Sequence, residues 1–471
     1  MLTECVPGDA LFTDLVSSAH RRFRRLVAEA EGKAKAFYQK TLGREATIQQ
    51  IVDEVFAAVE AEGDVAVARY AKAFDGAGAT ESFRVSKERM ARAWTLIPDD
   101  LRQAIQVAIR QVTDYQRRLL PASFGTDLDE PLGVRWMPLD RVGAYVPGGT
   151  SGSLPLFSSV IMNLVPAKVA GVAQTVLVSP PRADGTLATE LLATAHAVGV
   201  DEVYAVGGIP AIAALACGTP SIKAVDKLVG PGNIVVTMAK QRAYGRVDLD
   251  MLAGPSEILV LADDSAHPAF VAADLLSQAE HDALAMAVCI AVGHGVASGV
   301  QRELAVQLER LPAGRQEVAR ESIVRFGRLV RVNSVVEAID VANRIAAEHV
   351  ELMLRDPHPA IAGLRHAGAI FVGPWSPEPI GDYVAGPSHT LPTGGTARMW
   401  SGIAVDTFLR RTSIINFSEA DFRRLAPHGE VLAAAEGLEA HAHAIRIRRY
   451  PPRIVRPPTS VNIIVPPNQP G

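Results

Sequence analysis

Hydrophobic and polar positions change their pattern as the chain proceeds. Through residues 14–118, apolar residues recur at helical spacing among Ala, Arg, Glu and Gln, as in "IQQIVDEVFAAVEAEGDVAVARYAKAF". From about Val134, short apolar runs such as "TVLVSP" and "KLVGPGN" alternate with Ala-rich helical stretches such as "ATELLATAHAVGV". Strand and helix alternation with turns at Gly and Pro is typical of a doubly wound parallel sheet. The pattern therefore predicts a helical entry region followed by an α/β domain.

A second alternating block begins at "SEILVLAD" and continues to "GAIFVG", which predicts a second, related α/β unit. After Trp400 the pattern returns to helix, notably in "VLAAAEGLEAHAHAIRIR". Seven prolines between residues 451 and 471 exclude a helix there and predict an extended tail. The predicted fold is two Rossmann-like doubly wound α/β domains with small helical N- and C-terminal segments.

Composition and charge narrow the class of function. The chain has 471 residues, of which 48% are hydrophobic, and at roughly 100–200 residues per domain it holds two to four domains. The 47 basic and 51 acidic residues give a net charge of −4, which provides no field to hold nucleic acid or an anionic membrane. We therefore expect a partner that is a small molecule, with no nucleic acid and no membrane.

The sequence lacks a signal or membrane segment and lacks paired cysteines, and these two features bear on cellular location and on metal chemistry. The N-terminus lacks the apolar core of a signal peptide, and no segment approaches the roughly 20 apolar residues of a membrane span, so we expect a cytoplasmic protein. The three cysteines, Cys5, Cys217 and Cys289, show no CxxC spacing and indicate neither a disulfide framework nor a thiolate zinc site. Any metal ion must then be held by nitrogen and oxygen atoms.

The stretch "LLSQAEHDALAM" places Gln278 and His281 three residues apart in an otherwise apolar, helix-forming run. On a helix this spacing puts both side chains on one face, with Cβ atoms roughly 5–6 Å apart. An amide oxygen and an imidazole at that distance can bind one metal ion together. The alternative is that both side chains on a half-buried helix hydrogen-bond to a neighbouring loop.

Further polar side chains collect at the expected ends of elements, where sites form in α/β proteins. In "AAEHVELML", Glu348 and His349 stand where a helical pattern gives way to a strand-like run, which predicts a helix–strand junction. Each has a structural alternative: a Glu–His pair can cap a helix, an Asp after Gly can make an Asx-turn, and a His on an Ala-rich helix can lie at the surface. Several such residues occur, however, and each stands in an apolar or glycine-rich context, which favours a functional site. These residues are Glu348 and His349, Asp382 and His389, and Glu436 and His441.

Several long motifs occur in the order and spacing of one known family. They are "VGAYVPGG", "MNLVPAKVAGV", "VDKLVGPGN", "DMLAGPSEILVLAD", "AADLLSQAEHD", "AEHVEL", "GDYVAGPSHTLPTGGTAR" and "GLEAHAHA". The chain resembles histidinol dehydrogenase, the zinc- and NAD-dependent enzyme of histidine biosynthesis, over about residues 25 to 447. The resemblance implies a homodimer in which the C-terminal segment reaches across to complete the site of the partner subunit.

The resemblance also implies roles for individual residues. It implies that Glu348 and His349 form the acid–base pair, His349 taking the alcohol proton and Glu348 activating water on the aldehyde. The implied zinc ligands are Gln278, His281, Asp382 and His441. The implied substrate-binding residues are Ser256, Gln278, His281, His349, Asp382, His389, Glu436 and His441. The residues implied to line the NAD site are Tyr145, Asn233 and the position of Pro210.

The expected division of the chain follows the same resemblance. Residues 49–144 plus 257–401 are expected to form the first α/β domain, which is discontinuous and carries the zinc and acid–base residues. The second α/β domain, on the NAD side, is expected at residues 145–256. The remaining segments are an N-terminal helical segment at 1–48, a C-terminal helical segment at 402–447 that reaches the partner subunit, and a Pro-rich tail at 448–471.

The sequence departs from the family pattern at several positions. No GxGxxG follows the first strand, so NAD is implied by the resemblance alone. Pro210 stands where the family has a Gln that contacts the cofactor, and proline offers neither a side-chain amide nor a backbone N–H. Ala347 and Ser388 replace a more usual Pro and Asn, and the tail has no counterpart in the family. The zinc and acid–base positions are all intact.

The activity expected from these residues is oxidation of L-histidinol through L-histidinal to L-histidine, with two NAD consumed per turnover. A paralogous zinc- and NAD-dependent dehydrogenase of another small alcohol, such as a sulfopropanediol, is the closest rival. Ser256 and Glu436 favour histidinol, because an acidic residue suits an imidazole and repels a sulfonate. Rivals from other classes are a zinc hydrolase, in which Glu348 activates metal-bound water, and a non-catalytic zinc-stabilised dimer, which has no need of His349.

Overall fold

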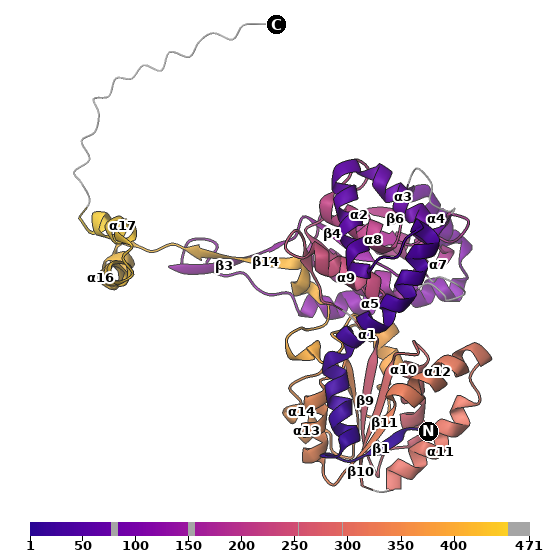
Figure 1. The fold of residues 1–471 in the computed structure, drawn as a ribbon. Helices are drawn as coiled ribbons and strands as arrows, with labels where there is room; N and C mark the ends of the chain where they lie inside the picture. The colour runs from indigo at the N-terminus through magenta and orange to yellow at the C-terminus, as the bar shows by residue number, and fades with distance from the viewer. Residues whose placement is uncertain (77–82, 149–155, 253, 294, 451–471) are drawn as a thin grey trace. The chain divides into compact units, whose positions relative to one another are not determined.

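The computed structural model describes residues 1–76, 83–148, 156–252, 254–293 and 295–450, and Figure 1 shows the elements they form. The predicted extended tail at residues 451–471 lies outside this range. The chain divides into two units, of which the first holds Met1–Pro121 and Pro138–Arg410 and the second holds Ala122–Met137 and Arg411–Gly471. Within the described ranges, no helix combines the length and the apolar character needed to cross a membrane.

The first unit contains two six-stranded sheets. In one of them, called sheet A, every strand pairs with its neighbours in parallel. Its strands, in spatial order, are β1 (Thr3–Cys5), β11 (Arg328–Val332), β10 (Met286–Val292), β9 (Glu257–Asp263), β12 (His349–Met353) and β13 (Ala369–Val372). The central strands are continuous apolar runs because both of their faces are covered by other elements.

Helices cover both faces of sheet A. Along β9, Ile258 and Val260 point to one face, and Leu259 and Leu261 point to the other. The first face packs against α10 (Pro268–Ala279), α11 (Gly295–Leu308) and α12 (Ala313–Phe326). The second face packs against the start of α1 (Ala10–Leu42), α13 (Val335–Ile345) and α14 (His358–Gly363). This arrangement is the doubly wound architecture that the alternation of strands and helices predicted.

The other six-stranded sheet, called sheet B, is parallel except for one antiparallel edge strand, β2. Its strands, in spatial order, are β2 (Arg84–Val85), β6 (Glu202–Ala205), β5 (Gln174–Ser179), β4 (Arg141–Tyr145), β7 (Lys227–Val229) and β8 (Asp248–Leu249). One face packs against α2 (Ile48–Glu62), α3 (Asp64–Asp75), α8 (Gly208–Cys217) and α9 (Ile234–Ala243). The other packs against α4 (Lys87–Leu96), α5 (Asp99–Arg118), α6 (Ser158–Ala170) and α7 (Thr189–Val198).

The predicted fold class of two Rossmann-like α/β domains is therefore confirmed, and so is the helical entry region. The helices of residues 48–118 cover sheet B, however, whereas the sequence-based division grouped residues 49–144 with residues 257–401. Their packing explains the difference. Phe56 of α2 joins the same buried cluster as Ile212 of α8, a contact between residues far apart in the sequence.

The second unit is small and has almost no interior of its own. It contains the two-stranded sheet of β3 (Leu132–Pro138) and β14 (Leu409–Ile415), followed by helices α16 (Glu419–Ala435) and α17 (Glu439–Arg449). Ala426 and Ala442 are the buried residues of these two helices, while Val431 and Leu432 are 68% and 66% exposed. A pair of helices that buries so little apolar surface gains little stability from its own packing.

Candidate active site

The sequence-predicted residues gather at a cleft of the first unit. On the sheet A side, the cleft lies at the amino ends of the strands, since Glu257 begins β9 and His349 begins β12. Sheet B contributes its carboxyl edge, because Pro231 follows the end of β7. Open α/β sheets commonly bind ligands at their carboxyl ends, so sheet A departs from that tendency. The cleft is lined by Leu156, Ser158, Ser159, Pro231, Gly254, Ser256, Gln278, His281, Glu348, His349, Glu378, Asp382, Tyr383, His389, Thr390, Leu391 and Thr393.

Gln278 and His281 both line this cleft, but they do not share a helix. Helix α10 ends at Ala279, and His281 lies in the turn beyond it, where its backbone N–H donates to the carbonyl oxygen of Gln278 at 3.2 Å. The prediction that both residues sit on one helical face is therefore wrong for His281. The turn nevertheless brings the imidazole to the same cleft as the Gln278 amide, which is 1% exposed and whose Oε1 has no hydrogen-bond partner among the described residues.

Glu348 and His349 stand at the predicted junction of helix and strand. Helix α13 ends at Ile345, Ala346 takes a left-handed conformation with φ 55°, and β12 begins at His349. Both side chains bond to the backbone of Glu257 on the neighbouring strand: the Glu257 N–H donates to Glu348 Oε2 at 2.9 Å, and His349 Nδ1 lies 2.9 Å from the Glu257 carbonyl oxygen. A carbonyl oxygen only accepts hydrogen bonds, so Nδ1 carries the proton. The lone pair of His349 is therefore on Nε2.

The Nε2 atom of His349 faces acidic groups across the cleft. It lies 3.8 Å from Glu378 Oε1 and 4.0 Å from Asp382 Oδ1, and it has no hydrogen-bond partner among the described residues. Burial lowers the pKa of His349 to about 3, so the ring is neutral at physiological pH. Burial, reinforced by nearby carboxylates, raises the pKa of Glu348 well above its usual value. The pair thus combines a neutral imidazole with a carboxyl group of increased basicity.

Asp382 and His389 reach the cleft from α15 (Glu378–Tyr383) and the loop that follows it. The Nδ1–H of His389 donates to the carbonyl oxygen of Asp382 at 3.0 Å, and its Nε2 accepts from the hydroxyl of Ser159 at 3.0 Å. Burial lowers the pKa of His389 to about 4. Ser256 lines the same cleft. The structure therefore brings together seven of the predicted residues: Ser256, Gln278, His281, Glu348, His349, Asp382 and His389.

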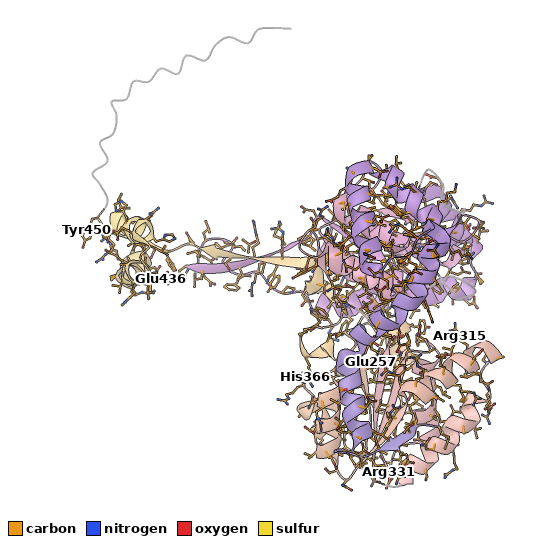
Figure 2. All side chains as sticks on the ribbon, viewed as in Figure 1. Glu257, Arg315, Arg331, His366, Glu436 and Tyr450 are labelled. Atoms are coloured by element: carbon orange, nitrogen blue, oxygen red, sulfur yellow. The ribbon has the colours of Figure 1, made fainter. Side chains whose placement is uncertain are left out.

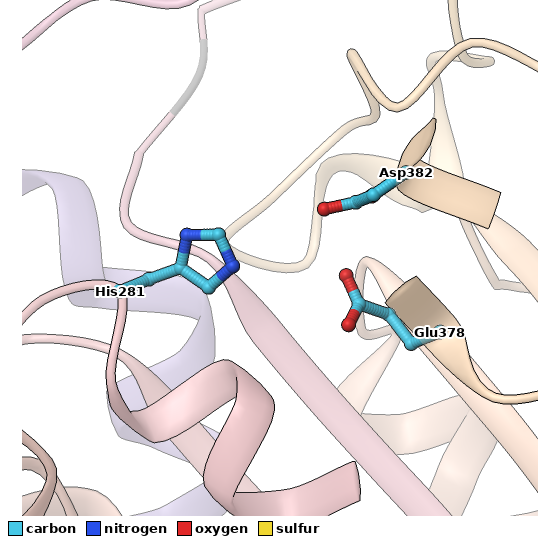
Figure 3. A group of neighbouring side chains, drawn as sticks. All are labelled: His281, Glu378 and Asp382. Carbon is cyan, nitrogen blue, oxygen red and sulfur yellow. The ribbon is translucent and has the colours of Figure 1, made fainter. Parts of the chain in front are cut away.

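One further acid belongs to this group and was not predicted. Glu378 begins α15 and is 1% exposed. Figure 3 shows its carboxylate directed toward the carboxylate of Asp382 and toward the imidazole of His281. One ligand atom from each of these three residues lies within 4.8 Å of the others. Glu378 precedes Asp382 by four residues, which is one helical turn, so "EPIGD" offered a spacing signal that the sequence analysis did not use.

The donor set of the cleft suits a divalent cation. Glu348, Glu378 and Asp382 place three carboxyl groups in the cleft, and none of its described lining residues is a Lys or an Arg. Burial raises the pKa of both Glu378 and Asp382, which shows how poorly their charges are compensated by the surrounding side chains. A zinc ion bound by imidazole, amide and carboxylate groups would supply the missing positive charge, so the residues fit the metal that the resemblance implies.

The residues predicted to contact NAD lie at the carboxyl edge of sheet B. Tyr145 ends β4, and Asn233 caps α9 by accepting from the backbone N–H groups of Val235 and Val236 at 3.1 Å. Pro210 is buried in the first turn of α8, where its missing N–H costs no helical hydrogen bond. The N-termini of α8 and α9 and the glycine turn at Gly230 lie at this edge of sheet B. Helix N-termini and glycine turns bind the phosphates of a dinucleotide, so the edge fits the implied cofactor.

A buried ion pair holds the loop that carries Asn233. Lys240 and Asp250, whose side chains are 3% and 1% exposed, bond to each other and to the backbone of Gly230. Lys240 Nζ donates to the Gly230 carbonyl at 2.9 Å, and the Gly230 N–H donates to Asp250 Oδ2 at 2.7 Å. Gly230 has φ 101°, and a Cβ there would lie 2.2 Å from the Tyr145 carbonyl oxygen. The ion pair therefore fixes a turn that only glycine can occupy against Tyr145.

The remaining two predicted residues belong to the second unit. Glu436 is the residue at the end of α16, and His441 lies in the first turn of α17; Figure 2 marks Glu436 in this pair of helices. Both are exposed, and neither lines the cleft as far as the described residues go. The first unit thus brings together three of the four predicted zinc ligands, and the fourth, His441, belongs to the second unit.

The first unit has the fold of an α/β enzyme, with an acid–base pair and candidate metal ligands at a single cleft. A family model described as histidinol dehydrogenase matches residues 39–449. The chain is 50% identical to the histidinol dehydrogenase of Moorella thermoacetica over 400 residues, covering 84% of this chain and 93% of that protein. It is 45% identical to that of Synechococcus over 432 residues, covering 90% and 97%.

A solved structure gives the same assignment. The crystal structure of histidinol dehydrogenase from Elizabethkingia anophelis superposes with a TM-score of 0.83 at 32% identity, covering 95% of this chain and 98% of that one. The chain belongs to the histidinol dehydrogenase family.

The ion pair at Gly230 leads to a first prediction. Replacing Lys240 with Met leaves a buried carboxylate unpaired, which typically costs about 3–5 kcal/mol. We expect Lys240→Met to accelerate amide hydrogen exchange of residues 230–233 by about tenfold or more relative to the rest of sheet B. The control is Glu202→Gln, which breaks the Arg141–Glu202 pair at the opposite edge of the same sheet. Equal acceleration of that loop in both variants would mean general loosening of the domain and would contradict a specific clamp.

Proposed function

We propose that this protein oxidises L-histidinol through L-histidinal to L-histidine, with two NAD reduced per turnover, in the last steps of histidine biosynthesis in the cytoplasm. Membership of the family supports the reaction class. The observation that carries the proposal is the orientation of His349: its Nε2 lone pair faces a cleft that also holds Gln278, His281 and Asp382. A general base and a set of candidate metal ligands at one cleft are what oxidation of a metal-anchored alcohol requires.

In the first oxidation, His349 accepts the hydroxyl proton of the alcohol. Its Nδ1–H bond to the Glu257 carbonyl fixes the tautomer, so Nε2 is the atom that takes the proton. NAD, when bound, accepts the hydride that leaves the same carbon. The carboxyl groups of Glu378 and Asp382 lie across the cleft at 3.8 and 4.0 Å from Nε2.

In the second oxidation, Glu348 accepts a proton from the water that adds to the aldehyde. Its raised pKa makes it a stronger base than a carboxylate in water, which suits this step. The Glu257 N–H holds Glu348 Oε2 at 2.9 Å, so the other carboxylate oxygen is the one that accepts the water proton. Loss of a second hydride from the hydrated aldehyde, for which bound NAD would be the acceptor, would leave the carboxylate of histidine.

Zinc would be held by Gln278, His281 and Asp382 of one chain together with His441 of the partner subunit, where it would act as a Lewis acid and anchor the imidazole and amine of the substrate. His389, held by Ser159, and Ser256 line the rest of the substrate cleft. Family membership makes a zinc hydrolase the weaker reading, because the matched relatives are dehydrogenases. A paralogous alcohol dehydrogenase is disfavoured by the acidic cleft, which repels a sulfonate.

A homodimer with shared sites accounts for the second unit. Helices α16 and α17 expose large apolar side chains such as Val431 and Leu432 and bury little between them. Apolar surface of this kind is stabilised by docking against another protein surface. Docking on a second copy would bring Glu436 and His441 to the partner's cleft. His441 would then be the fourth zinc ligand beside the three that the cleft already contains.

The second prediction tests the activity itself. The metal-loaded protein should form NADH from L-histidinol, and about twice as much NADH as histidinol should accumulate at completion, because two hydrides leave each substrate. Chelation, or His281→Ala, should abolish NADH formation while the helical circular dichroism signal remains. Full activity in a preparation shown to be metal-free by elemental analysis would contradict the role of zinc. NADH formation from a sulfonated diol but not from histidinol would favour the paralogue.

The third prediction separates the two residues of the acid–base pair. His349→Ala should depress oxidation of supplied histidinol, since that step needs the alcohol base. Glu348→Gln should lose much more activity with supplied histidinal than with histidinol, and general-base assistance is worth roughly 10²–10⁴-fold. The measurement is the rate of NADH formation from each substrate separately. Equal losses of Glu348→Gln on both substrates would assign Glu348 to substrate binding or site geometry and not to water activation.

The fourth prediction tests the shared site by mixing inactive subunits. His349→Ala and His441→Ala chains should both be inactive as homodimers, but their hybrid contains one intact site. Equal mixing should restore about a quarter of wild-type activity, because half of the dimers are hybrids and each has one of two sites intact. A matched control mixes His349→Ala with Glu348→Gln, whose defects lie in the same unit. Since no hybrid site is then intact, recovery in this control as well would contradict sharing.

A further inference from the structure

Glu378 is the acidic residue of the cleft to which neither the motifs nor the proposed reaction gives a ligand role. Its side chain is 1% exposed, and its backbone N–H is held by Glu351 Oε1 at 2.7 Å, so the start of α15 is fixed in place on β12. Its Oε1 has no hydrogen-bond partner among the described residues. A carboxylate so deeply buried needs compensation from donors or cations, because its desolvation costs several kcal/mol otherwise.

The neighbours of Glu378 do not provide that compensation. Ser277 Oγ lies 3.3 Å from Glu378 Oε2, but this hydroxyl has a single proton and a closer acceptor in the Asp274 carbonyl at 2.8 Å. His349 Nε2 is 3.8 Å from Oε1 and carries a lone pair and no proton, as its Nδ1–H bond requires. The remaining close group is the carboxyl of Asp382, which hydrogen-bonds to Glu378. Two acids in contact share one proton, so the pair still carries negative charge, and the described lining of the cleft has no Lys or Arg to balance it.

The position of Glu378 Oε1 indicates where the charge that balances this carboxylate comes from. Oε1 of Glu378 faces the cleft, where the Oε1 of Gln278 is also buried and also lacks a partner among the described residues. His281 and Asp382 place their ligand atoms within 4.8 Å of the Glu378 carboxylate, and the three side chains converge in Figure 3. Two buried oxygens without partners, on two elements that line one cleft beside an imidazole, are the kind of donor set that binds a divalent cation.

We propose that Glu378 is a metal-site residue of this protein, whose carboxylate supplies the second negative charge that holds the divalent ion beside Asp382. The proposal deepens the metal-dependent function proposed above and rests on it. A single Asp with neutral Gln and His ligands leaves a divalent ion one charge short of neutrality in a buried cleft. Glu378 provides that charge at a fixed position, because the Glu351 contact anchors its backbone.

The test measures metal affinity and not turnover. The full-length protein is stripped with a chelator and titrated with Zn²⁺ against a chromophoric competitor, and with Co²⁺ by its visible absorption. Glu378→Gln keeps the shape and removes the charge, so it should weaken Zn²⁺ binding by about 10–100-fold, as loss of groups around a metal site typically does. It should also change the Co²⁺ spectrum, which a purely structural role would leave unaltered.

A matched control comes from the same cluster of buried acids. Glu351 is fully buried on β12 and does not line the cleft, and Gln at this position still accepts from the Glu378 N–H. Glu351→Gln should therefore bind Zn²⁺ as the wild type does. If Glu378→Gln does not fold, Glu378→Asp keeps the charge and withdraws it by one methylene, and its affinity should fall between those of wild type and a charge-free site.

The outcomes separate this inference from the function on which it rests. Wild-type protein that binds neither Zn²⁺ nor Co²⁺ would overturn the metal-dependent function. Wild-type protein that binds both, with unchanged affinity and spectrum in Glu378→Gln or in Glu378→Asp, would overturn the role of Glu378 alone. An equal loss of affinity in Glu351→Gln would also overturn it, since the effect would then follow from disturbing the buried acids in general.

Discussion

The hydrogen bond between His349 Nδ1 and the Glu257 carbonyl is the contact on which the chemistry of this cleft depends. It joins two neighbouring parallel strands at their first residues, and it decides which ring nitrogen keeps the proton. The same residue, Glu257, donates its N–H to Glu348, so one peptide unit orients both members of the acid–base pair. Because strand pairing fixes that peptide unit, the geometry of the pair is as rigid as sheet A itself.

That rigidity is matched on the other side of the cleft by a different device. At the carboxyl edge of sheet B, the buried Lys240–Asp250 pair bonds to both the N–H and the carbonyl of Gly230. The backbone of this glycine turn is therefore held in one position although it lies in a loop. The amino edge of sheet A and the carboxyl edge of sheet B require different geometries. The acid–base pair needs a fixed proton position, whereas a cofactor loop needs a backbone that can approach its ligand closely.

The local features of this site could be predicted from the sequence, and its long-range contacts could not. Glu348 and His349 were expected at a helix–strand junction because the apolar period changes there, and the structure confirms the junction. His281 was placed on a helix because "LLSQAEHDALAM" has no strong stop signal, yet the helix ends two residues earlier. The packing of residues 48–118 on sheet B depends on contacts between distant segments, which periodicity does not encode. Glu378 was overlooked although its four-residue spacing from Asp382 was visible in the sequence, because its burial beside His349 and Ser277 is established only on folding.

The absence of Lys and Arg among the described residues of the cleft has a consequence for the end of the catalytic cycle. The alcohol and the aldehyde are uncharged at the reacting carbon, so they enter an acidic cleft without penalty there. The final product carries a new carboxylate at that same carbon, in a cleft whose described lining includes Glu348 and Glu378. Repulsion between like charges is strong in a poorly solvated space, so each carboxyl group of the cleft that is ionised would hold the charged product less tightly than the uncharged aldehyde.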